Sequence, residues 1–470
     1  MKIALIDPKG DVSGFNAGLG IIAAVLSGAG HEIKVYDCNN GLAGAETVLS
    51  RIMAWRPDMA GFSVKTNTLT AAVEMAAALA KEGVRVFAGG AGITCQGKQF
   101  ITEHQFFHAA FLGEVDDTIA AYVEHASDGE FLKTLPGICF LDGKDVFCAG
   151  IHLPGDINTI PDFSAFDTAA QITGDYPLVT SRGCPFDCIY CSVNKISGRL
   201  WRKRSAESVV AEIKKAYETH GITGFVIADD NFTMDIARAK EICNLLIREH
   251  LPIRWRCING IRADRVDEDL LALMKAAGCD TVWFGIESMN ENIFNAIKKG
   301  EELAAVTRAV WWAKKAGMSV GGFFIAGLPG STYAQDRSTL AQARKLELDE
   351  MLWSIATPFP DTEFWDWAQK NGRRLGDYRT TSFFKLPRPV FETDDYPAGE
   401  RLKMFYEGNL AGYSYSCFFS RRITVADVIM FVVFILRYDM RNILTHIGKI
   451  FFGKYHRKYL REALKRLFRN

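Results

Sequence analysis

The chain of 470 residues lacks several features that would each define a class of protein. It has no net charge, because 55 basic residues balance 55 acidic ones, so nucleic acid is not expected as its main ligand. The longest apolar run of the C-terminal region, 428–436, is far shorter than the roughly 20 residues that a spanning helix needs. The loop DPKGDVSG after the expected first strand does not reproduce G-x-G-x-x-G, which argues against a dinucleotide site there.

The N-terminal stretch MKIALIDPKG also lacks the apolar region and cleavage site of a secretory leader. We therefore expect a cytoplasmic protein whose thiols stay reduced. Eight of the eleven cysteines are scattered among apolar or strand-like surroundings, and we expect most of them to be small core residues. These eight are Cys38, Cys95, Cys139, Cys148, Cys243, Cys257, Cys279 and Cys417.

The pattern of strands and helices predicts an α/β protein in three parts. Short β-branched runs alternate with amphipathic segments at the start, which predicts a parallel, Rossmann-like sheet over residues 1–135. Residues 136–170 are expected to form a linker with a hairpin around DGK. Six further strand candidates separated by helical segments predict a partial (β/α)6 barrel over 171–375. Residues 376–470 predict a mostly helical, basic region.

Three cysteines lie together in SRGCPFDCIYCSVN, where Cys184, Cys188 and Cys191 have the spacing C-x3-C-x2-C directly after an expected strand. A structural zinc site needs a fourth ligand, and no further Cys or His lies in this loop. A chance group of core cysteines is disfavoured because Pro185 and Asp187 make the loop a polar turn. Three thiolates on a [4Fe-4S] cluster leave one iron open for another ligand. The loop therefore predicts such a cluster.

This motif, with Tyr190 just before the third cysteine, resembles the radical S-adenosylmethionine (SAM) enzymes. In that superfamily the open iron takes the amino and carboxylate groups of SAM, and the reduced cluster cleaves SAM to a 5′-deoxyadenosyl radical. The resemblance implies that Cys184, Cys188 and Cys191 are the catalytic, metal-ligating residues. It also implies a small-molecule substrate and an external electron donor of the flavodoxin or ferredoxin type.

Polar residues and glycines follow the later barrel strands, at the end where such barrels carry their sites. The resemblance implies that several of them contact SAM, the polar groups of IADDNFT meeting its amino group and the GLPG backbone its adenine. Arg262 would hold the SAM carboxylate by a bidentate contact. Each residue alone is equally compatible with helix capping or a solvated role. The expected SAM contacts are Tyr190, Asp229, Asp230, Asn231, Asn259, Arg262, Glu287, Gly327, Leu328 and Pro329.

A Rossmann-like domain before such a barrel resembles the cobalamin-dependent, class B branch of the superfamily, and the match includes GLGIIAAVLSGAGHEIKVYD, GGAGIT and LGEVDDTI. The histidine of D-x-H-x-x-G that ligates cobalt from below is absent from DPKGDVSG, so the resemblance implies cobalamin bound without that ligand. Lys65 lies either under the cobalt or in an ordinary loop. The expected cobalamin contacts are Ser63, Val64, Lys65, Gly89, Gly90, Thr94, Gly113 and Glu114.

Joined together, the two resemblances imply an enzyme that methylates an unactivated carbon. One SAM would methylate the cobalamin, a second would give the radical that removes a hydrogen atom from the substrate, and methylcobalamin would deliver the methyl group. A radical SAM cyclase or rearrangement enzyme acting on a lipid or tetrapyrrole without methyl transfer is the alternative.

A hypothesis of another class is a membrane-surface binding protein with a structural cluster. The basic, aromatic end FFGKYHRKYLREALKRLFRN supports it, because such a segment can lie in a bilayer interface. The protein would then be membrane-associated and its substrate lipophilic. Helices packed on the barrel with a solvated basic face explain the same segment equally well.

Overall fold

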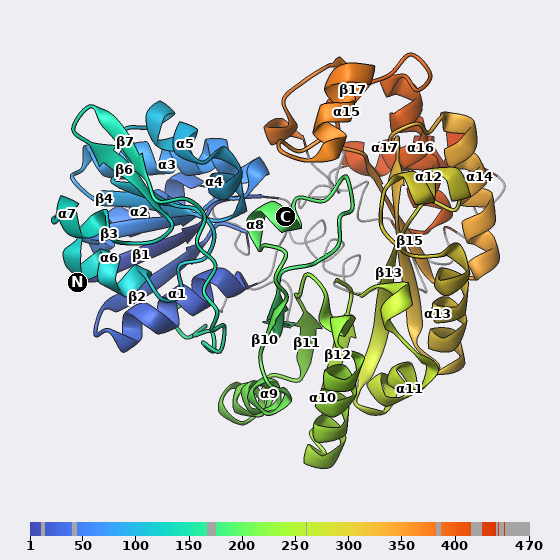
Figure 1. Cartoon of the computed structure of the whole chain (residues 1–470), viewed down its shortest axis with the longest axis horizontal. Helices are drawn as coiled ribbons and strands as arrows, with labels where there is room; N and C mark the ends of the chain where they lie inside the picture. The colour runs from blue at the N-terminus through green and yellow to red at the C-terminus, as the bar shows by residue number, and fades with distance from the viewer. Residues whose placement is uncertain are drawn as a thin grey trace. The chain divides into compact units, whose positions relative to one another are not determined.

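Figure 1 shows the computed structural model of the chain. It divides into two compact units. The first unit comprises Met1–Asp187, Cys191–Thr281 and Tyr378–Thr380, and the second comprises Cys188–Tyr190, Val282–Asp377 and Thr381–Asn470. The residues that the structure describes are 1–10, 15–39, 45–166, 175–259, 261–381, 387–414, 425–438, 440 and 446.

A seven-stranded sheet with the order β2-β1-β3-β4-β5-β6-β7 opens the first unit, and its first five strands are parallel. Alternate residues of a strand point to opposite faces, and β1 accordingly sends Ile3 and Leu5 to one apolar cluster and Ala4 and Ile6 to another. Buried faces on both sides confirm the predicted Rossmann-like sheet. The parallel strands are β1 (Lys2–Asp7), β2 (Glu32–Asp37), β3 (Met59–Ser63), β4 (Arg85–Gly89) and β5 (Ala109–Phe111).

Helices connect these strands in the order that a doubly wound sheet requires. The N-cap of α1 is Asn16, whose side chain accepts from the backbone N–H of Leu19 at 3.2 Å. The helices are α1 (Ala17–Gly28), α2 (Ala45–Trp55), α3 (Leu69–Lys81), α4 (Ala91–Gln96), α5 (Lys98–Glu103), α6 (Ile119–His125) and α7 (Gly129–Leu132), with the 3-10 turn η1 (Thr66–Thr68) before α3.

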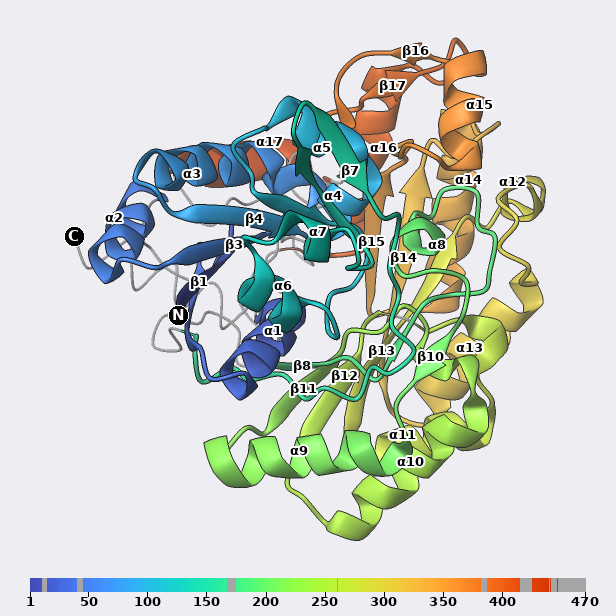
Figure 2. The same ribbon diagram turned by 60° about the vertical axis from the view of Figure 1, so that its left-hand side comes forward.

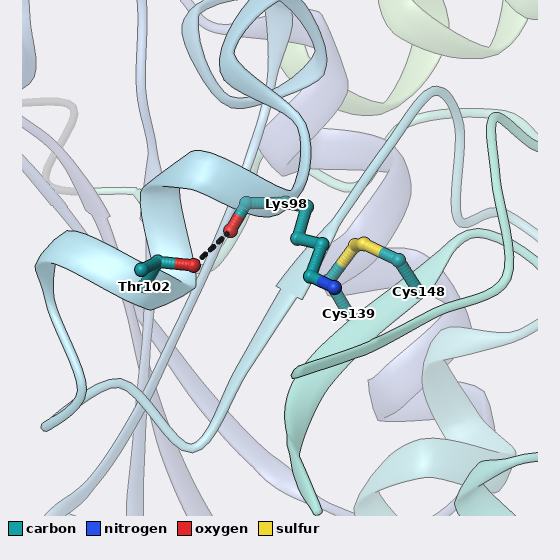
Figure 3. Close-up of a disulfide and its surroundings, with 4 residues drawn as sticks. All are labelled: Lys98, Thr102, Cys139 and Cys148. Carbon is teal, nitrogen blue, oxygen red and sulfur yellow. Dashed lines mark hydrogen bonds between the residues drawn. A yellow bond between two sulfur atoms is a disulfide. The ribbon is translucent and has the colours of Figure 1, made fainter. Parts of the chain in front are cut away.

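The hairpin that we assigned to the linker extends the sheet instead. Its strands β6 (Ile138–Asp142) and β7 (Asp145–Cys148) pair antiparallel, and β6 also pairs antiparallel with β5. Because their register places Cys139 opposite Cys148, the two sulfurs form a disulfide with the Cα atoms 4.2 Å apart, close to α5 (Figure 3). The expectation that all thiols stay reduced is therefore wrong for this pair.

A second sheet has the order β15-β14-β13-β12-β11-β8, so its strands follow the chain order that a partial barrel predicts. All six strand candidates are confirmed. Strand β13 begins in the first unit and ends in the second. The strands are β8 (Tyr176–Leu178), β11 (Gly224–Ile227), β12 (Arg254–Cys257), β13 (Cys279–Glu287), β14 (Ser319–Ala326) and β15 (Glu350–Ile355), and a two-stranded ribbon of β9 (Ser181–Arg182) and β10 (Arg202–Lys203) follows β8.

The helices between the barrel strands begin at polar caps that the sequence supplies. Ser205, Asp235 and Asp267 each accept a backbone N–H in the first turn of α9, α10 and α11. Helices α9 and α10 pack side by side below β11 (Figure 2). The helices are α8 (Val193–Ile196), α9 (Ala206–His220), α10 (Ile236–Glu249), α11 (Glu268–Ala276), α12 (Glu291–Ala296), α13 (Leu303–Lys315), α14 (Tyr333–Ala343) and α15 (Glu363–Asn371).

The described part of the C-terminal region is mostly helical, as predicted, with α16 (Ala398–Ala411), α17 (Val425–Tyr438) and a two-stranded ribbon of β16 (Arg373–Arg374) and β17 (Phe391–Glu392). No helix in the described ranges combines the length and the apolarity needed to span a bilayer. The basic segment 451–470, on which the membrane hypothesis rests, lies outside the described residues.

Candidate functional site

The cysteine loop (residues 183–192) leaves β9 and leads into α8. Cys184, Cys188 and Cys191 remain thiols there and are partly exposed. No three His, Cys, Asp or Glu side chains in the described ranges converge as a preformed metal site, so the fit to a cluster rests on the donor chemistry. Three thiols within eight residues are the ligand set that an iron–sulfur cluster takes.

The surroundings of Cys184 include two of the predicted SAM contacts. Burial raises the pKa of the Cys184 thiol, while a hydrogen bond from the Asn231 side chain and the charge of Arg262 act in the opposite direction. The Arg262 guanidinium also lies 3.4 Å from the ring centroid of Phe186, inside the cysteine loop. The structure thus brings Asn231 and Arg262 to this loop.

The predicted partners of the SAM amino group have internal roles. Asp229 is 3% exposed and accepts from the backbone N–H and the hydroxyl of Thr180 and from the hydroxyl of Ser181, each at 2.6 Å. Both of its oxygens are thereby used to fix the connection between β8 and β9, and a contact of Asp229 with SAM stays a prediction. Asp230 accepts from the backbone N–H of Gly183 at 2.9 Å and so holds the start of the cysteine loop.

Arg262 makes a bidentate contact with Asp264 in the described structure, and its contact with the SAM carboxylate stays a prediction. The Arg262 side chain donates to Asp264 from Nε at 2.9 Å and from Nη2 at 3.2 Å. Arg262 is 7% exposed, so this pair is largely desolvated. Asn259 lies just before it, exposed, and its carbonyl accepts from the Cys257 thiol at 3.5 Å.

In the second unit, the end of β13 carries a buried group of charges around Glu287. Lys299 donates to the carbonyl oxygen of Gly285. Its Nζ lies 3.2 Å from Glu301 and 3.6 Å from Glu287. Glu287 has a φ of +64°, a backbone conformation that side chains other than glycine adopt rarely. Its carboxylate is therefore engaged by Lys299 in the described structure, and its contact with SAM stays a prediction.

The glycine-rich loop after β14 is held by two charged side chains. Gly327 donates its N–H to Asp336 at 2.9 Å and accepts at its carbonyl from Arg401 at 2.8 Å. Its φ is +84°, and a Cβ there would collide with the Arg401 guanidinium. The guanidinium lies over the rings of Phe391 and Tyr396, at 4.2 and 4.8 Å from their centroids. Glycine at 327 therefore makes room for Arg401, and the contact of this loop with adenine stays a prediction.

Tyr190 and Leu328 share one apolar cluster with Ile189, Ile293 and Ile297. Leu328 is almost fully buried and Tyr190 partly so. The main chain of Ile189 donates to the carbonyl of Ile297 at 3.1 Å. Two predicted SAM contacts from distant parts of the sequence thus lie together in the second unit, next to the buried Pro329.

In the first unit, the loops after β1 and β3 meet through side chains. The Asn16 amide donates to the Ser63 hydroxyl at 3.1 Å. Lys65 lies 3.1 Å from the buried carboxylate of Asp7. Val64 is fully buried and donates its N–H to the carbonyl of the next strand end, Gly89, at 2.8 Å. Lys65 is thus a member of an ion pair, and a place under cobalt stays a prediction.

The turn after β4 fits closely against the end of β3. Gly90 has a φ of +103°, and a Cβ there would lie 2.8 Å from the carbonyl oxygen of Val64. Thr94 donates to the carbonyl of Gly90 at 3.2 Å and accepts the N–H of Gly113 at 2.9 Å. Three strand ends therefore meet at one edge of the sheet and carry the small residues Ser63, Gly89 and Gly113. This is the edge at which open α/β sheets bind large cofactors, so it fits cobalamin.

The carboxylate of Glu114 is bound by two arginines. Its carboxylate accepts from Arg182 at 2.6 Å and from Arg202 at 2.6 and 2.8 Å. Arg182 also donates to Asp116 at 2.7 Å. All four side chains are at most 14% exposed. Glu114 therefore ties the Rossmann-like sheet to the ribbon that precedes Cys184, and its contact with cobalamin stays a prediction.

Sequence reasoning missed Arg182, Arg202 and Arg401. The only signal for Arg182 was its place directly before Gly183 and Cys184, and the other two arginines had no motif around them. The structural role of each arginine can be recognised only from the carboxylate or carbonyl that it contacts, and that partner is distant in the sequence.

Comparisons with known proteins agree with this geometry. Residues 178–343 match the family model of the radical SAM superfamily, and residues 2–123 match that of the B12 binding domain. An uncharacterized methyltransferase of Pyrococcus horikoshii is 29% identical over 94% of this chain and 98% of its own length. The cytidylyl-2-hydroxyethylphosphonate methyltransferase of Streptomyces wedmorensis is 28% identical over 66% of this chain and 68% of its own.

Two solved structures share the fold. The radical SAM methyltransferase TsrM of Kitasatospora setae, solved with cobalamin and a [4Fe-4S] cluster, has a TM-score of 0.64 at 19% identity over 77% of this chain and 73% of its own. The cobalamin-dependent enzyme OxsB, solved with aqua-cobalamin and SAM, has a TM-score of 0.61 at 17% identity over 78% of this chain and 55% of its own.

The chain belongs to the radical SAM superfamily and carries the B12-binding domain of its cobalamin-dependent branch. It is a radical SAM enzyme of a family that includes methyltransferases, and its cofactors are a [4Fe-4S] cluster, SAM and cobalamin.

Proposed function

We propose that the protein methylates an unactivated carbon of a small molecule. The observation that carries the proposal is the junction in the first unit, where Glu114 of the B12-binding domain binds Arg182 and Arg202 on either side of the cysteine loop. A methyl carrier and a radical generator must act on one substrate, and this junction joins the B12-binding domain to the ribbon strands that flank the cysteine loop.

The side chains named above would hold the cofactors and exclude water. Cys184, Cys188 and Cys191 would ligate the cluster, while Tyr190 and Leu328 would provide an apolar wall. When bound, the cluster would supply the electron that cleaves SAM, and cobalamin would supply the methyl group. The chain's contribution is orientation, because Asp230, Glu114 and Arg401 hold loops rather than exchange protons. The residue-level contacts of SAM and cobalamin are part of this proposal.

Ring formation is the second candidate. An anaerobic magnesium-protoporphyrin IX monomethyl ester cyclase of Cereibacter sphaeroides, which is 25% identical over 81% of this chain, favours this candidate.

The class of substrate is a separate question. The hopanoid C-3 methylase of Methylococcus capsulatus is 24% identical over 80% of this chain. The names of this methylase and of the cyclase both describe large, mostly apolar substrates. We propose a lipophilic substrate on this ground.

Membrane contact is part of the same proposal. The exposed side chains Val432, Val433 and Leu436 on α17 favour it, because exposed apolar groups on one helix suit a bilayer interface.

The test combines cofactor content with product analysis. Anaerobic reconstitution with iron, sulfide and hydroxocobalamin, followed by desalting, should leave about four irons and one cobalt per chain. Cys188→Ala should lose the iron and keep the cobalt, whereas Cys95→Ala, a control cysteine outside the loop, should keep both. Iron retained by Cys188→Ala would contradict the ligand assignment.

With SAM and a strong reductant, formation of both S-adenosylhomocysteine and 5′-deoxyadenosine supports methyl transfer. Formation of 5′-deoxyadenosine alone supports the cyclase, and the absence of both products would end the proposal.

A further inference from the structure

The ring of Phe186 contacts two arginines beside the cysteine loop. The Arg262 guanidinium lies 3.4 Å from the centroid of this ring, and the Arg265 guanidinium lies 5.6 Å from it. A cation over the face of an aromatic ring is attracted by the negative charge density of that face, most strongly where water is excluded. Phe186 lies between Cys184 and Cys188, so this ring belongs to the loop that we propose to ligate the cluster.

The position of Arg262 is fixed by three constraints. Its Nε and Nη2 donate to the two carboxylate oxygens of Asp264 at 2.9 and 3.2 Å. Its guanidinium lies over the Phe186 ring, and the residue is only 7% exposed. These contacts leave a long side chain little rotamer freedom, so the guanidinium is held in one place before any ligand binds.

Arg265 adds a second positive charge to the same group. Its Nε lies 3.9 Å from Asp264, which also accepts from Arg262. Two guanidinium groups that share one carboxylate keep a net positive charge. Such a group favours an anionic partner, and a carboxylate matches the geometry of a guanidinium.

The main chain of Phe186 is held within the cysteine loop. Its carbonyl accepts from the side-chain amide of Asn194, in α8, at 2.7 Å. Its backbone N–H is hydrogen-bonded to the Cys184 thiol. Phe186 thus contacts a proposed cluster ligand through its main chain and Arg262 through its ring. All of these residues belong to the first unit.

We propose that Phe186 is a positioning residue for SAM, because its ring holds Arg262 in place for the carboxylate of SAM. The inference rests on the proposed function, which includes the contact between Arg262 and SAM. Binding to Arg262 forms and breaks no covalent bond. Phe186 contributes by pre-organising the cation, so replacing its ring weakens the binding of SAM.

The affinity for SAM is the first readout. The probe is radiolabelled SAM in anaerobic equilibrium dialysis against reconstituted protein with its cluster oxidised, so that SAM binds without being cleaved. Phe186→Leu keeps an apolar side chain and removes the ring face, and it should raise the Kd about fivefold. Phe186→Tyr keeps the ring face and should stay within about twofold of wild type. Equal Kd values for wild type and Phe186→Leu, or equal weakening by both substitutions, would overturn the proposal.

Phe106→Leu makes the same change at an exposed ring of the B12-binding domain and is the matched control. It should bind SAM as the wild type does.

A double-mutant cycle shows whether Phe186 acts through Arg262. Arg262→Gln removes the cation and should itself raise the Kd for SAM. Phe186→Leu added to Arg262→Gln should then change the Kd less than about twofold, because the ring has no cation left to hold. If the two effects multiply, the ring acts independently of Arg262 and the positioning role is wrong.

The electron paramagnetic resonance spectrum of the reduced cluster is the second readout, because it reports only molecules that hold a cluster. The SAM concentration that gives half of the spectral change should be about fivefold higher in Phe186→Leu than in wild type. If Phe186→Leu holds no cluster, Phe186→Met, with a longer apolar side chain, takes its place with the same expected shift. An unchanged half-point would contradict the proposal.

Failure of the proposed function gives a different result. The wild type would then form neither S-adenosylhomocysteine nor 5′-deoxyadenosine, whatever its Kd for SAM. Failure of the positioning role alone would leave both products and equal Kd values in wild type and Phe186→Leu.

Discussion

Single buried side chains decide how the glycine-rich loop of the second unit is held. Asp336 is 2% exposed, and burial raises the pKa of its carboxyl to about 7, against the smaller opposing effect of the hydrogen bond from Gly327. Burial also lowers the pKa of Arg401 to about 10. The loop is thus fixed by a carboxyl group that changes its charge near neutral pH.

Asp336→Asn tests this carboxyl through the pH dependence of stability. The folded chain keeps a proton on Asp336 that the unfolded chain has already released, so the wild type should lose stability as the pH rises from about 4 to 7. The loss should be about 2 kcal/mol between pH 5 and 7 and should level off above pH 7. The amide variant keeps an acceptor for the N–H of Gly327 and lacks this titration. Urea unfolding midpoints at several pH values measure the difference.

Asp366→Asn, at an exposed position on α15 of the same unit, is the matched control and should follow the wild type. Parallel pH profiles for wild type and Asp336→Asn would show that the carboxyl has no raised pKa.

At the scale of elements, the turn between β4 and α4 leaves no room for a side chain at Gly90 of the cobalamin edge. Gly90→Ala places a Cβ against the backbone of Val64 in a backbone conformation that alanine rarely adopts. We expect a loss of about 1–3 kcal/mol in stability and a clear loss of retained cobalt, because the turn must move. Thermal unfolding and cobalt content after reconstitution measure the two effects.

Gly28→Ala, in α1, is the control, since a Cβ there meets no atom within 4 Å. It should be neutral or slightly stabilising. Wild-type cobalt content in Gly90→Ala would contradict the close fit of the turn.

Strands and helix starts could be predicted from the sequence because their signals are local. The six barrel strands are short apolar runs, and Ser205, Asp235 and Asp267 mark helix starts by their chemistry alone. The position of the β6–β7 hairpin was not predicted correctly. Its turn residues indicate that the two strands pair with each other, but they do not indicate the strand of the sheet with which the hairpin pairs.

At the scale of the whole molecule, the join between the B12-binding domain and the cysteine loop depends on Glu114. Glu114→Gln removes the charge that Arg182 and Arg202 share in a nearly buried place, and we expect a loss of about 3 kcal/mol. The cluster should also be lost faster to a chelator, because the ribbon before Cys184 is released. Thermal unfolding and the rate of iron loss are the measurements. Glu124→Gln, exposed on α6, should match the wild type in both. Unchanged iron loss in Glu114→Gln would contradict the positioning role.

The partners of the site could not be predicted at this scale. Glu114 and Arg182 are 68 positions apart, and no periodicity links them. The family pattern indicated the loops from which we propose that the site is formed. It assigned Asp229, Arg262 and Gly327 to SAM, whereas their nearest polar partners are side chains of this chain, and such pairings follow only from packing.

The bridge between Cys139 and Cys148 has a consequence for anyone who prepares this enzyme. Thiol reagents are commonly added during iron–sulfur reconstitution, and they reduce disulfides by thiol–disulfide exchange. A sample handled with excess thiol would therefore carry an uncrosslinked hairpin at the edge of its cobalamin sheet. Two laboratories that follow different recipes would then study two covalently different molecules.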